Sequence, residues 1–382
     1  MKIVLVVDQF DDANNGTTIS GRRFAQALAA HGNQVRVIAC GRPAANKYTV
    51  RTMRFPLAVE HLVSSQGMRL AVPNRHAFEK AAAWADVVHF LLPSPLSIMG
   101  LRHVEEIGVP HTAAFHCQPE NITFSIHLGN NTKVNDWIYN RFRDTFYNRF
   151  THIHCPSNMI AEQLRLHGYT AQLHVISNGI SPAFYYQKRP KEDALAGKFV
   201  IIMVGRYSGE KRQDELIEAC RNSRHARRIQ LILAGKGPLE KKYRKLCGGL
   251  PNPAIMEFYS PERLVEILAQ CDLYVHASDA EIEAMSCMEA FACGLVPVIA
   301  DSPRSATPQF ALDERSLFPA GDAQTLARKI DYWIEHPEER REMEHRYAES
   351  AKQYSLQRSI ELTEAMFRQA IEEQRQTESE AL

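Results

Sequence analysis

The sequence predicts an α/β protein built from two doubly wound parallel-sheet domains. Its 382 residues exceed the usual size of one hydrophobic core, so two domains are expected. Runs of apolar, β-branched residues alternate with segments of helical periodicity, which is typical of parallel sheets covered by helices on both faces. This alternation stops at a polar, proline-containing segment, residues 181–198, and then begins again.

The first half contains a series of short apolar runs that predict strands. These runs are Ile3 to Val7, Val35 to Ala39, Val87 to Leu91, Thr112 to Phe115, Ile153 to Cys155 and Leu173 to Ile176. Helical spacing fills most of the gaps, and the clearest helix opens near Thr18 and stops at Gly32, where a glycine accepts a left-handed cap. We therefore expect a first Rossmann-like domain over residues 1–180.

A second set of strand-like runs follows the polar linker. These runs are Phe199 to Val204, Gln230 to Ala234, Leu273 to His276 and Val296 to Ala300. Their spacing fits a second doubly wound domain, which we place at residues 196–355. From about Ala323 onward the chain is helical, charged and without strands, and we expect its last helix, residues 356–376, to return to the first domain.

Composition and cysteine usage indicate a cytoplasmic protein. Hydrophobic residues make up 45% and charged residues 23%, with no apolar run long enough to cross a bilayer. The opening apolar run ends at Asp8 with no cleavage site after it, so we interpret it as a strand and not as a secretion signal. The eight cysteines include no Cys-x-x-Cys and lie mostly in apolar stretches, which favours reduced thiols over metal or redox use.

The charge of the chain is unevenly distributed although its formal net value is only +1. Through Pro190 there are 19 Lys and Arg against 12 Asp and Glu, a balance of +7, and the remainder carries −6. A basic half suits an anionic ligand or the inner face of the cell membrane, where we expect the protein as a peripheral partner. Nucleic-acid binding usually requires denser clusters and a recognisable module, and the sequence has neither.

Loops that follow the strands are candidates for anion binding, because ligands of open parallel sheets bind beyond the carboxyl ends of the strands. In the loop Asp11 to Thr18, Gly16 would let the backbone approach a phosphate, although an ordinary Asn-Gly turn is an equal alternative. In the second half, Gly205 is followed by Arg206, Lys211 and Arg212 near a helix start. Cations normally gather at helix C-termini, so this pattern predicts a bound anion such as a diphosphate, with solvated surface charges as the alternative.

Two glutamates form the most specific pattern in the sequence. Seven residues separate Glu281 from Glu289, and a helix over residues 283–292 would place the first before its N-terminus and the second two turns inside it. Carboxylates accept hydrogen bonds from the vicinal hydroxyls of a sugar or ribose, while the helix N-terminus can hold phosphate. Glu283 is an alternative to Glu281, or a solvated residue.

Together these motifs resemble those of the retaining glycosyltransferases of family 4, which have the GT-B fold of two Rossmann-like domains facing each other across a cleft. The resemblance covers nearly the whole chain. The matching residues are Glu281 and Glu289 of the Glu-x7-Glu motif, Gly205, Arg206 and Lys211, Asn178 and Gly179 in VISNGI, and Gly235 and Gly237 in LILAGKGP.

The resemblance implies a role for each cationic and acidic residue of the motifs. Arg206 and Lys211 would neutralise the donor diphosphate and stabilise the leaving group, which is electrostatic catalysis. Glu289 would bind the ribose hydroxyls, and Glu281 would hold the transferred sugar.

Further donor contacts are implied for backbone groups and for one histidine. The amides of Met285 and Ser286 would lie near the distal phosphate, and Gly16, Gly205 and Gly235 would line the donor. His116, in TAAFHCQPENI, fits the position of a histidine that ends a strand and faces the donor sugar, with a buried, hydrogen-bonded histidine as the alternative.

Members of this family generally transfer sugar without a metal ion or other cofactor. We therefore interpret Asp8, Asp11 and Asp12 as loop residues and not as metal ligands. Two departures affect the donor-sugar pocket: Glu283 and Ala284 stand where the family often has Phe-Gly, and Ser302-Pro303 stands where it often has Gly-Gly. The identity of the sugar therefore stays open.

Two further stretches, HCQPENI and DSPRSATPQFALDERSLF, resemble bacterial diacylglycerol glucosyltransferases of the same family. We expect a hexosyltransferase that moves glucose from UDP-glucose to a membrane lipid such as diacylglycerol. A basic domain gains about 1 kcal/mol from anionic lipid per suitably placed Lys or Arg. The segment 133–150, where aromatic residues alternate with arginines, is either an interfacial surface or, as is more frequent for aromatic stripes, core.

Other functions share the expected fold. Transfer to a soluble or polyprenyl-linked saccharide and a sugar-nucleotide epimerase are the main alternatives, because fold alone does not decide between them. A phosphorylase of this fold would usually need a pyridoxal cofactor. A binding protein with a degenerate site is disfavoured, since His116, Arg206, Lys211, Glu281 and Glu289 are all present.

Overall fold

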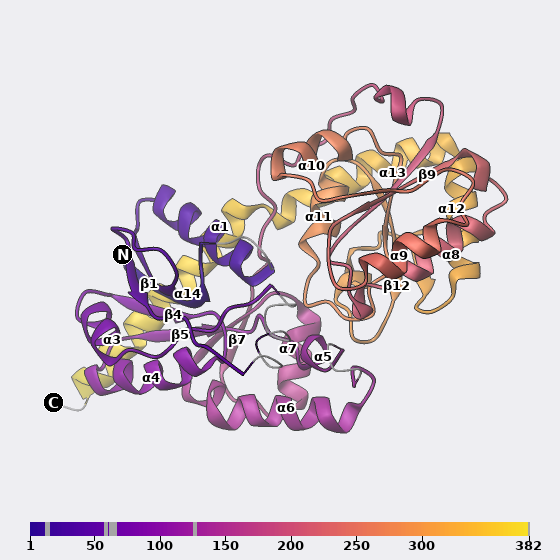
Figure 1. The fold of residues 1–382 in the computed structure, drawn as a ribbon. Helices are drawn as coiled ribbons and strands as arrows, with labels where there is room; N and C mark the ends of the chain where they lie inside the picture. Colours follow the sequence, from indigo (N-terminus) through magenta and orange to yellow (C-terminus); the bar gives the residue numbers. More distant parts are fainter. Residues whose placement is uncertain (12–15, 57–59, 61–66, 125–127, 381–382) are drawn as a thin grey trace. The chain divides into compact units, whose positions relative to one another are not determined.

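The computed structural model describes residues 1–11, 16–56, 60, 67–124 and 128–380. The chain forms two compact units (Figure 1). The first unit comprises Met1–Thr123, Asn130–Asn178 and Gln357–Leu382, and the second comprises Phe124–Gly129 and Gly179–Leu356. Each unit has its own parallel sheet, as the sequence predicts.

The sheet of the first unit has seven parallel strands in the order β3-β2-β1-β4-β5-β6-β7. The strands are β1 (Lys2–Gln9), β2 (Gln34–Cys40), β3 (Lys47–Val50), β4 (Val87–Phe90), β5 (His111–Ala114), β6 (His152–Cys155) and β7 (Gln172–Val175). Interior strands such as β1, with the run Ile3 to Val7, have continuous apolar sequences because helices cover both faces of a parallel sheet. Ile3, Val4 and Val6 of β1 are fully buried.

The described residues of the first unit include helices that each bury one face. They are α1 (Gly16–Ala30), α3 (Arg75–Ala82), α4 (Pro95–Ile107), α5 (Pro119–Phe124), α6 (Thr132–Thr145), α7 (Asn158–Leu166) and α14 (Leu356–Glu380). Helix α1 packs Phe24, Ala25 and Leu28 inward, and Gly32 beyond its end has φ of +89°, a left-handed conformation that glycine adopts without strain.

The C-terminal helix α14 lies within the first unit, although the rest of the C-terminal half forms the second (Figure 1). Glu364 accepts a hydrogen bond from Asn33 at 2.6 Å and pairs with His31 at 3.2 Å. Further along the helix, Glu373 pairs with His152 at 2.9 Å. These contacts attach α14 to the first sheet and to the loop before β2.

The sheet of the second unit has six parallel strands in the order β10-β9-β8-β11-β12-β13. The strands are β8 (Phe199–Val204), β9 (Ile229–Ala234), β10 (Ile255–Glu257), β11 (Leu273–His276), β12 (Val296–Asp301) and β13 (Leu317–Pro319). The helices are α8 (Gln213–Asn222), α9 (Glu240–Cys247), α10 (Pro261–Leu268), α11 (Met285–Ala292), α12 (Ala323–Glu335) and α13 (Pro337–Ser350). Every strand predicted from an apolar run is present in one of the two sheets.

The strand order of each sheet reverses beside its first strand. In the first unit this reversal lies between β1 and β4, and in the second it lies between β8 and β11. Loops on the two sides of such a switch point diverge at the carboxyl edge and leave a crevice where ligands of α/β sheets bind. The loops after β8 and β11, which carry the motifs of the second half, therefore lie where a ligand of the second sheet is expected.

Candidate active site

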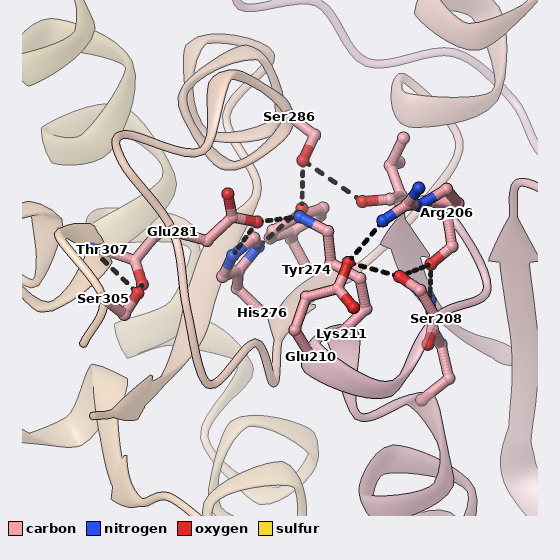
Figure 2. A network of polar contacts seen from close by, with 12 residues as sticks. Arg206, Ser208, Glu210, Lys211, Tyr274, His276, Glu281, Ser286, Ser305 and Thr307 are labelled. Carbon is pink, nitrogen blue, oxygen red and sulfur yellow. Dashed lines mark hydrogen bonds and ion pairs between the residues drawn. The ribbon is translucent and has the colours of Figure 1, made fainter. Parts of the chain in front are cut away.

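The loops after β8 and β11 bring two predicted site residues into direct contact. Lys211 ends a short 3-10 helix, Gly209–Lys211, after β8, and Glu281 lies in the loop after β11. The Lys211 ammonium group forms an ion pair with Oε1 of Glu281 (Figure 2). Residues that are 70 positions apart thus meet at the switch point of the second sheet.

Glu281 is held by both its backbone and its side chain. It forms an isolated parallel bridge with Ser305, and its carbonyl accepts a hydrogen bond from the Ala306 amide at 2.9 Å. Burial alone would raise the pKa of this carboxyl group, but Lys211 and His276 lower the pKa to about 2. The carboxylate is therefore ionised at any physiological pH and is fixed in place before a ligand arrives.

Arg206 belongs to a second carboxylate pair beside the first. Its guanidinium lies 3.0 Å from Oε1 of Glu210, which also accepts a hydrogen bond from the Ser208 hydroxyl at 2.5 Å (Figure 2). Glu210 is only 4% exposed. The two predicted phosphate-binding cations are thus each oriented by a buried carboxylate.

Arg212 has a different environment from Arg206 and Lys211. It adopts a left-handed backbone conformation with φ of 54°, and helix α8 begins at the following residue. Its guanidinium lies 3.3 Å from Asp279 and 3.8 Å from Glu215. Arg212 therefore belongs to a carboxylate cluster at the start of α8.

The helix that carries Glu289 begins later than the sequence predicts. Helix α11 starts at Met285, not at Glu283, because Ala284 has φ of 65° and ends the preceding loop in a left-handed conformation. Met285 and Ser286 form its first turn, and Glu289 is buried in its second. Glu283 is 1% exposed, so its interpretation as a solvated residue was wrong.

Two glycines after β9 are required by packing. A Cβ atom on Gly235 would lie 2.0 Å from the carbonyl oxygen of Gly205, and one on Gly237 would lie 2.6 Å from that of Tyr207. The amide of Gly205 donates to the carbonyl of Ala234 at 3.0 Å, which ties the loops after β8 and β9 together. Gly235 therefore shapes the loop that carries Arg206, whatever else it contacts.

His276 was not predicted as a site residue from the sequence, and it is fully buried at the end of β11. Its Nε2 atom lies 3.3 Å from Oε1 of Glu281, and its Nδ1 atom lies 3.2 Å from the Tyr274 hydroxyl. The signal that could have found it is a polar residue closing the otherwise apolar run LYVH, five positions before the first motif glutamate.

In the first unit, His116 follows β5 by two residues and is buried. It lines a small buried hollow with Leu5, Phe24, His89, His154 and Phe367. Burial, with His154 nearby, lowers the pKa of His116 to about 3, so the imidazole is neutral at physiological pH. The ring of His154 stands edge-on to it with centroids 5.3 Å apart.

The predicted loop Asp11 to Thr18 lies only partly within the described residues. Residues 12–15, which include Asp12, lie outside the described residues, and Gly16 is the first residue of α1. Asp11 pairs with Lys47 at 2.9 Å.

Asp8 is not a loop residue as predicted. It lies inside β1, is 2% exposed, and accepts a hydrogen bond from the Ala71 amide at 2.9 Å. The prediction failed because the run of apolar residues ends before Asp8 while the strand continues to Gln9.

Most aromatic residues of the segment 133–150 belong to the core. Tyr139, Phe146, Tyr147 and Phe150 are at most 3% exposed, whereas Trp137 on α6 is 64% exposed. The core interpretation therefore holds for these buried rings and fails for Trp137.

Two family models match adjacent parts of the chain. The model described as Glycosyltransferase Family 4 matches residues 14–184, and the model described as Glycosyl transferases group 1 matches residues 186–354. Together they cover most of both units.

The chain belongs to glycosyltransferase family 4.

Solved structures share the architecture of this glycosyltransferase. Sucrose-phosphate synthase from Thermosynechococcus elongatus superimposes with a TM-score of 0.77 at 17% identity, over 96% of this chain and 98% of its own. HepE from Anabaena, in complex with UDP-glucose, gives a TM-score of 0.73 at 18% identity, over 97% and 98%. Identities this low show the fold alone, which is the two-domain α/β GT-B fold predicted from the sequence.

A closer sequence match covers less of this glycosyltransferase. The catalytic domain of cholesterol-alpha-glucosyltransferase from Helicobacter pylori is 52% identical over 41% of this chain and 99% of its own, with a TM-score of 0.40. No curated protein matches the sequence.

Among the described residues, no three His, Cys, Asp or Glu side chains are grouped so that they could hold a metal ion. Within the same ranges, no helix combines the length and apolar character needed to cross a bilayer.

Proposed function

We propose that this glycosyltransferase transfers glucose from UDP-glucose to a membrane lipid such as diacylglycerol, with retention of anomeric configuration and without a metal ion. The observation that carries the proposal is the Lys211–Glu281 ion pair at the switch point of the second sheet. It joins a cation suited to a diphosphate to a carboxylate suited to sugar hydroxyls, in the crevice where α/β sheets bind ligands.

Different groups of this crevice would bind different parts of the donor. Arg206 and Lys211 would face the diphosphate, and their positive charges would stabilise the charge that develops on the leaving group as the glycosidic bond breaks. Glu281 would accept hydrogen bonds from hydroxyls of the transferred sugar, and Glu289 from those of the ribose. The fold shared with HepE, which was solved with UDP-glucose, supports this choice of donor.

Groups at two helix N-termini would complete the donor contacts. The first turn of α11, at Met285 and Ser286, would present backbone amides to the distal phosphate. Gly205 would let the diphosphate approach the backbone after β8, and Gly16 would do the same at the start of α1. His116 would contribute a neutral imidazole, able to donate or accept one hydrogen bond with the sugar.

A surface stripe on α6 supports a membrane acceptor. Lys133, Trp137 and Arg141 are all exposed and are spaced four residues apart, so they lie along one face of the helix. Tryptophan prefers the membrane–water interface, and lysine and arginine are attracted to anionic lipid headgroups. The net positive charge of this half of the chain would also attract an anionic membrane.

A donor and acceptor panel tests the proposed reaction. Purified protein is incubated with UDP-glucose, UDP-galactose, UDP-GlcNAc or GDP-mannose, with and without anionic vesicles that contain diacylglycerol or cholesterol, and both nucleotide release and glycolipid are measured. Cholesterol is included because the 52% identical catalytic domain is named for it. We expect glycolipid only from UDP-glucose with diacylglycerol vesicles, its α-linkage visible by NMR, and no loss of activity in EDTA.

Other outcomes of the panel revise the proposal in defined ways. Nucleotide release without lipid product would move the acceptor to a soluble saccharide, product with cholesterol alone would make it a sterol, and no turnover with any donor would contradict the donor assignment.

The α6 stripe has a separate test. Trp137→Ala should weaken binding to anionic vesicles by about tenfold, because it removes the interfacial anchor. Leu166→Ala is the matched control, since Leu166 on α7 is also apolar and 77% exposed but lies outside the stripe. Equal loss in both variants would mean that the stripe has no special role.

A further inference from the structure

A chain of polar contacts links Glu281 to the start of α11 through the interior of the second unit (Figure 2). The Nε2 atom of His276 lies 3.3 Å from Oε1 of Glu281, and its Nδ1 atom lies 3.2 Å from the Tyr274 hydroxyl. Tyr274 donates to the Ser286 hydroxyl at 3.1 Å, and Ser286 donates to the carbonyl of Val204 at 3.2 Å. We call these contacts the His276 relay.

The relay joins the two parts of the proposed donor site that would bind the sugar and the phosphate next to it. Glu281 would hold the transferred sugar, while Ser286 lies in the helix turn that would face the distal phosphate. Tyr274 and His276 are two residues apart on β11, so their side chains project from the same face of the strand, and both are fully buried. Their position in the core gives the relay a rigid base.

When His276 is neutral, the relay lacks one of the protons that its contacts require, because both ring nitrogens face an acceptor. Ser286 and Tyr274 each direct their single proton toward Val204 and Ser286 respectively, so the Tyr274 oxygen is left to accept from Nδ1 of His276. A neutral imidazole has only one N–H, and its Nε2 lone pair would then face a carboxylate 3.3 Å away. A second proton on His276 would convert this repulsion into a charge-assisted contact.

Several titratable or charged groups surround the relay and set its charge state. Burial is the main effect on the pKa of His276 and lowers it, Glu281 raises it, and Lys211 lowers it. The net effect lowers the pKa of His276 and favours its neutral form. The groups facing His276 and its partners are Lys211 after β8, Glu281 after β11, Tyr274 on β11, and Cys287 and Glu289 on α11.

A bound nucleoside diphosphate would change this balance. The ion pairs Lys211–Glu281 and Arg206–Glu210 each have no net formal charge. A diphosphate adds about two negative charges in a buried setting where Coulomb interactions are weakly screened. Protonation of His276 would offset part of that charge and complete the relay at the same time.

We propose that His276 is a positioning residue that takes up a proton when the nucleoside diphosphate binds, and that in its charged state it fixes both Glu281 and Ser286. This inference rests on the proposed function, because the donor supplies the anion. His276 acts through its two neighbours and need not touch the donor.

The test measures proton uptake during UDP binding. UDP is titrated calorimetrically into the full-length protein between pH 6 and 8, in two buffers that differ in ionisation enthalpy, and the titration is repeated with His276→Gln. The glutamine amide can donate from a position near that of Nε2 but does not titrate. We expect wild-type affinity to fall with rising pH by up to tenfold per unit, and this part of the slope to vanish in His276→Gln.

A second variant tests the relay without changing the histidine. Tyr274→Phe removes the acceptor of the Nδ1 proton, so a neutral His276 can carry its single proton on Nε2 and satisfy Glu281. The proton uptake should therefore fall in Tyr274→Phe as well. Tyr347→Phe is the matched control, because Tyr347 is equally buried and its hydroxyl bonds to Ser316 at 2.7 Å, away from the relay.

The outcomes separate this inference from the proposed function. Titration of UDP itself and of other carboxylates is common to all variants, so only the difference between variants reports on His276. If wild type, His276→Gln and Tyr274→Phe bind UDP with the same pH slope, the inference is wrong and the donor site stands. If wild type binds no UDP at any pH, the proposed function itself fails.

Discussion

The carboxyl edges of the two sheets have the same topology and different chemistry. Each edge has its switch point beside the first strand of its sheet, between β1 and β4 or between β8 and β11. At the second-unit edge, Lys211 and Arg206 are paired with the side-chain carboxylates of Glu281 and Glu210. In the first unit, burial lowers the pKa of His116 to about 3, so its imidazole is neutral throughout the physiological range. Burial raises the pKa of Asp8 to about 6, so its carboxyl group is neutral only at lower pH. Topology therefore fixes where a site can lie, while the side chains decide which ligand it suits.

The largest expected effect is a loss of turnover on substitution of Lys211, at the carboxyl edge of the second sheet. Lys211→Ala removes a cation from the proposed diphosphate site, and turnover should fall by about 100-fold or more while binding of the donor changes less. Steady-state kinetics with UDP-glucose measure this loss. Lys242→Ala is the matched control, because Lys242 is an exposed lysine of the same unit that pairs with Asp214 at 3.1 Å.

A different loss is expected for the buried glutamate of α11. Glu289→Ala should raise the dissociation constant for the donor by about tenfold to a hundredfold, because hydrogen bonds to a charged group contribute roughly 1.5–3 kcal/mol. Calorimetry with UDP and with UDP-glucose measures the change. Undiminished activity in both Lys211→Ala and Glu289→Ala would contradict the assignment of the donor site to the carboxyl edge of the second sheet.

Substitution of His116, at the carboxyl edge of the first sheet, should lower turnover less than the changes above, and by a factor that does not depend on pH. His116→Asn removes a neutral imidazole, so turnover should fall by about tenfold. Because the pKa of His116 lies near 3, the loss should be the same at pH 6 and pH 8. Activity profiles of wild type and variant over this range give the answer, and a loss that grows at one end of it would mean that His116 titrates there.

The smallest effect concerns stability. Burial raises the pKa of Asp8 to about 6 from an ordinary value of 3.8. A folded-state pKa above the unfolded value stabilises the fold below pH 4 and loses this contribution as pH rises through 6. Asp8→Asn stays neutral and can keep the bond from Ala71, so it should melt several degrees higher than wild type at pH 8 and at nearly the same temperature at pH 4. A stabilisation that is equal at both pH values would show that Asp8 does not titrate as expected.

The strands that the sequence did not predict are all at sheet edges. β3, β10 and β13 close the edges of their sheets and have the short sequences KYTV, IME and LFP. An edge strand has a neighbour on one side only and buries less, so its apolar pattern is weak. Interior strands such as β8, which are buried on both faces, were predictable from the run FVIIMV.

The candidate site was predictable to the extent that motifs identify it. Spacing of residues predicted that Glu281 and Glu289 share one helix region, and the resemblance added Arg206 and Lys211. The Lys211–Glu281 contact, the carboxylate behind Arg206 and the role of His276 depend on how loops fold back on one another. Likewise, nothing in the sequence indicates that Ala284 adopts a left-handed conformation and delays the start of α11.

The central claim is that the carboxyl edge of the second sheet binds the nucleotide sugar, and hydrogen–deuterium exchange with and without UDP tests it most directly. Bound ligand protects the amides that it contacts or orders. We predict slower exchange over residues 205–212 and 284–290, and little change over β9 or α12. Saturating UDP that leaves both segments unchanged, or that protects only other parts of the chain, would contradict the account.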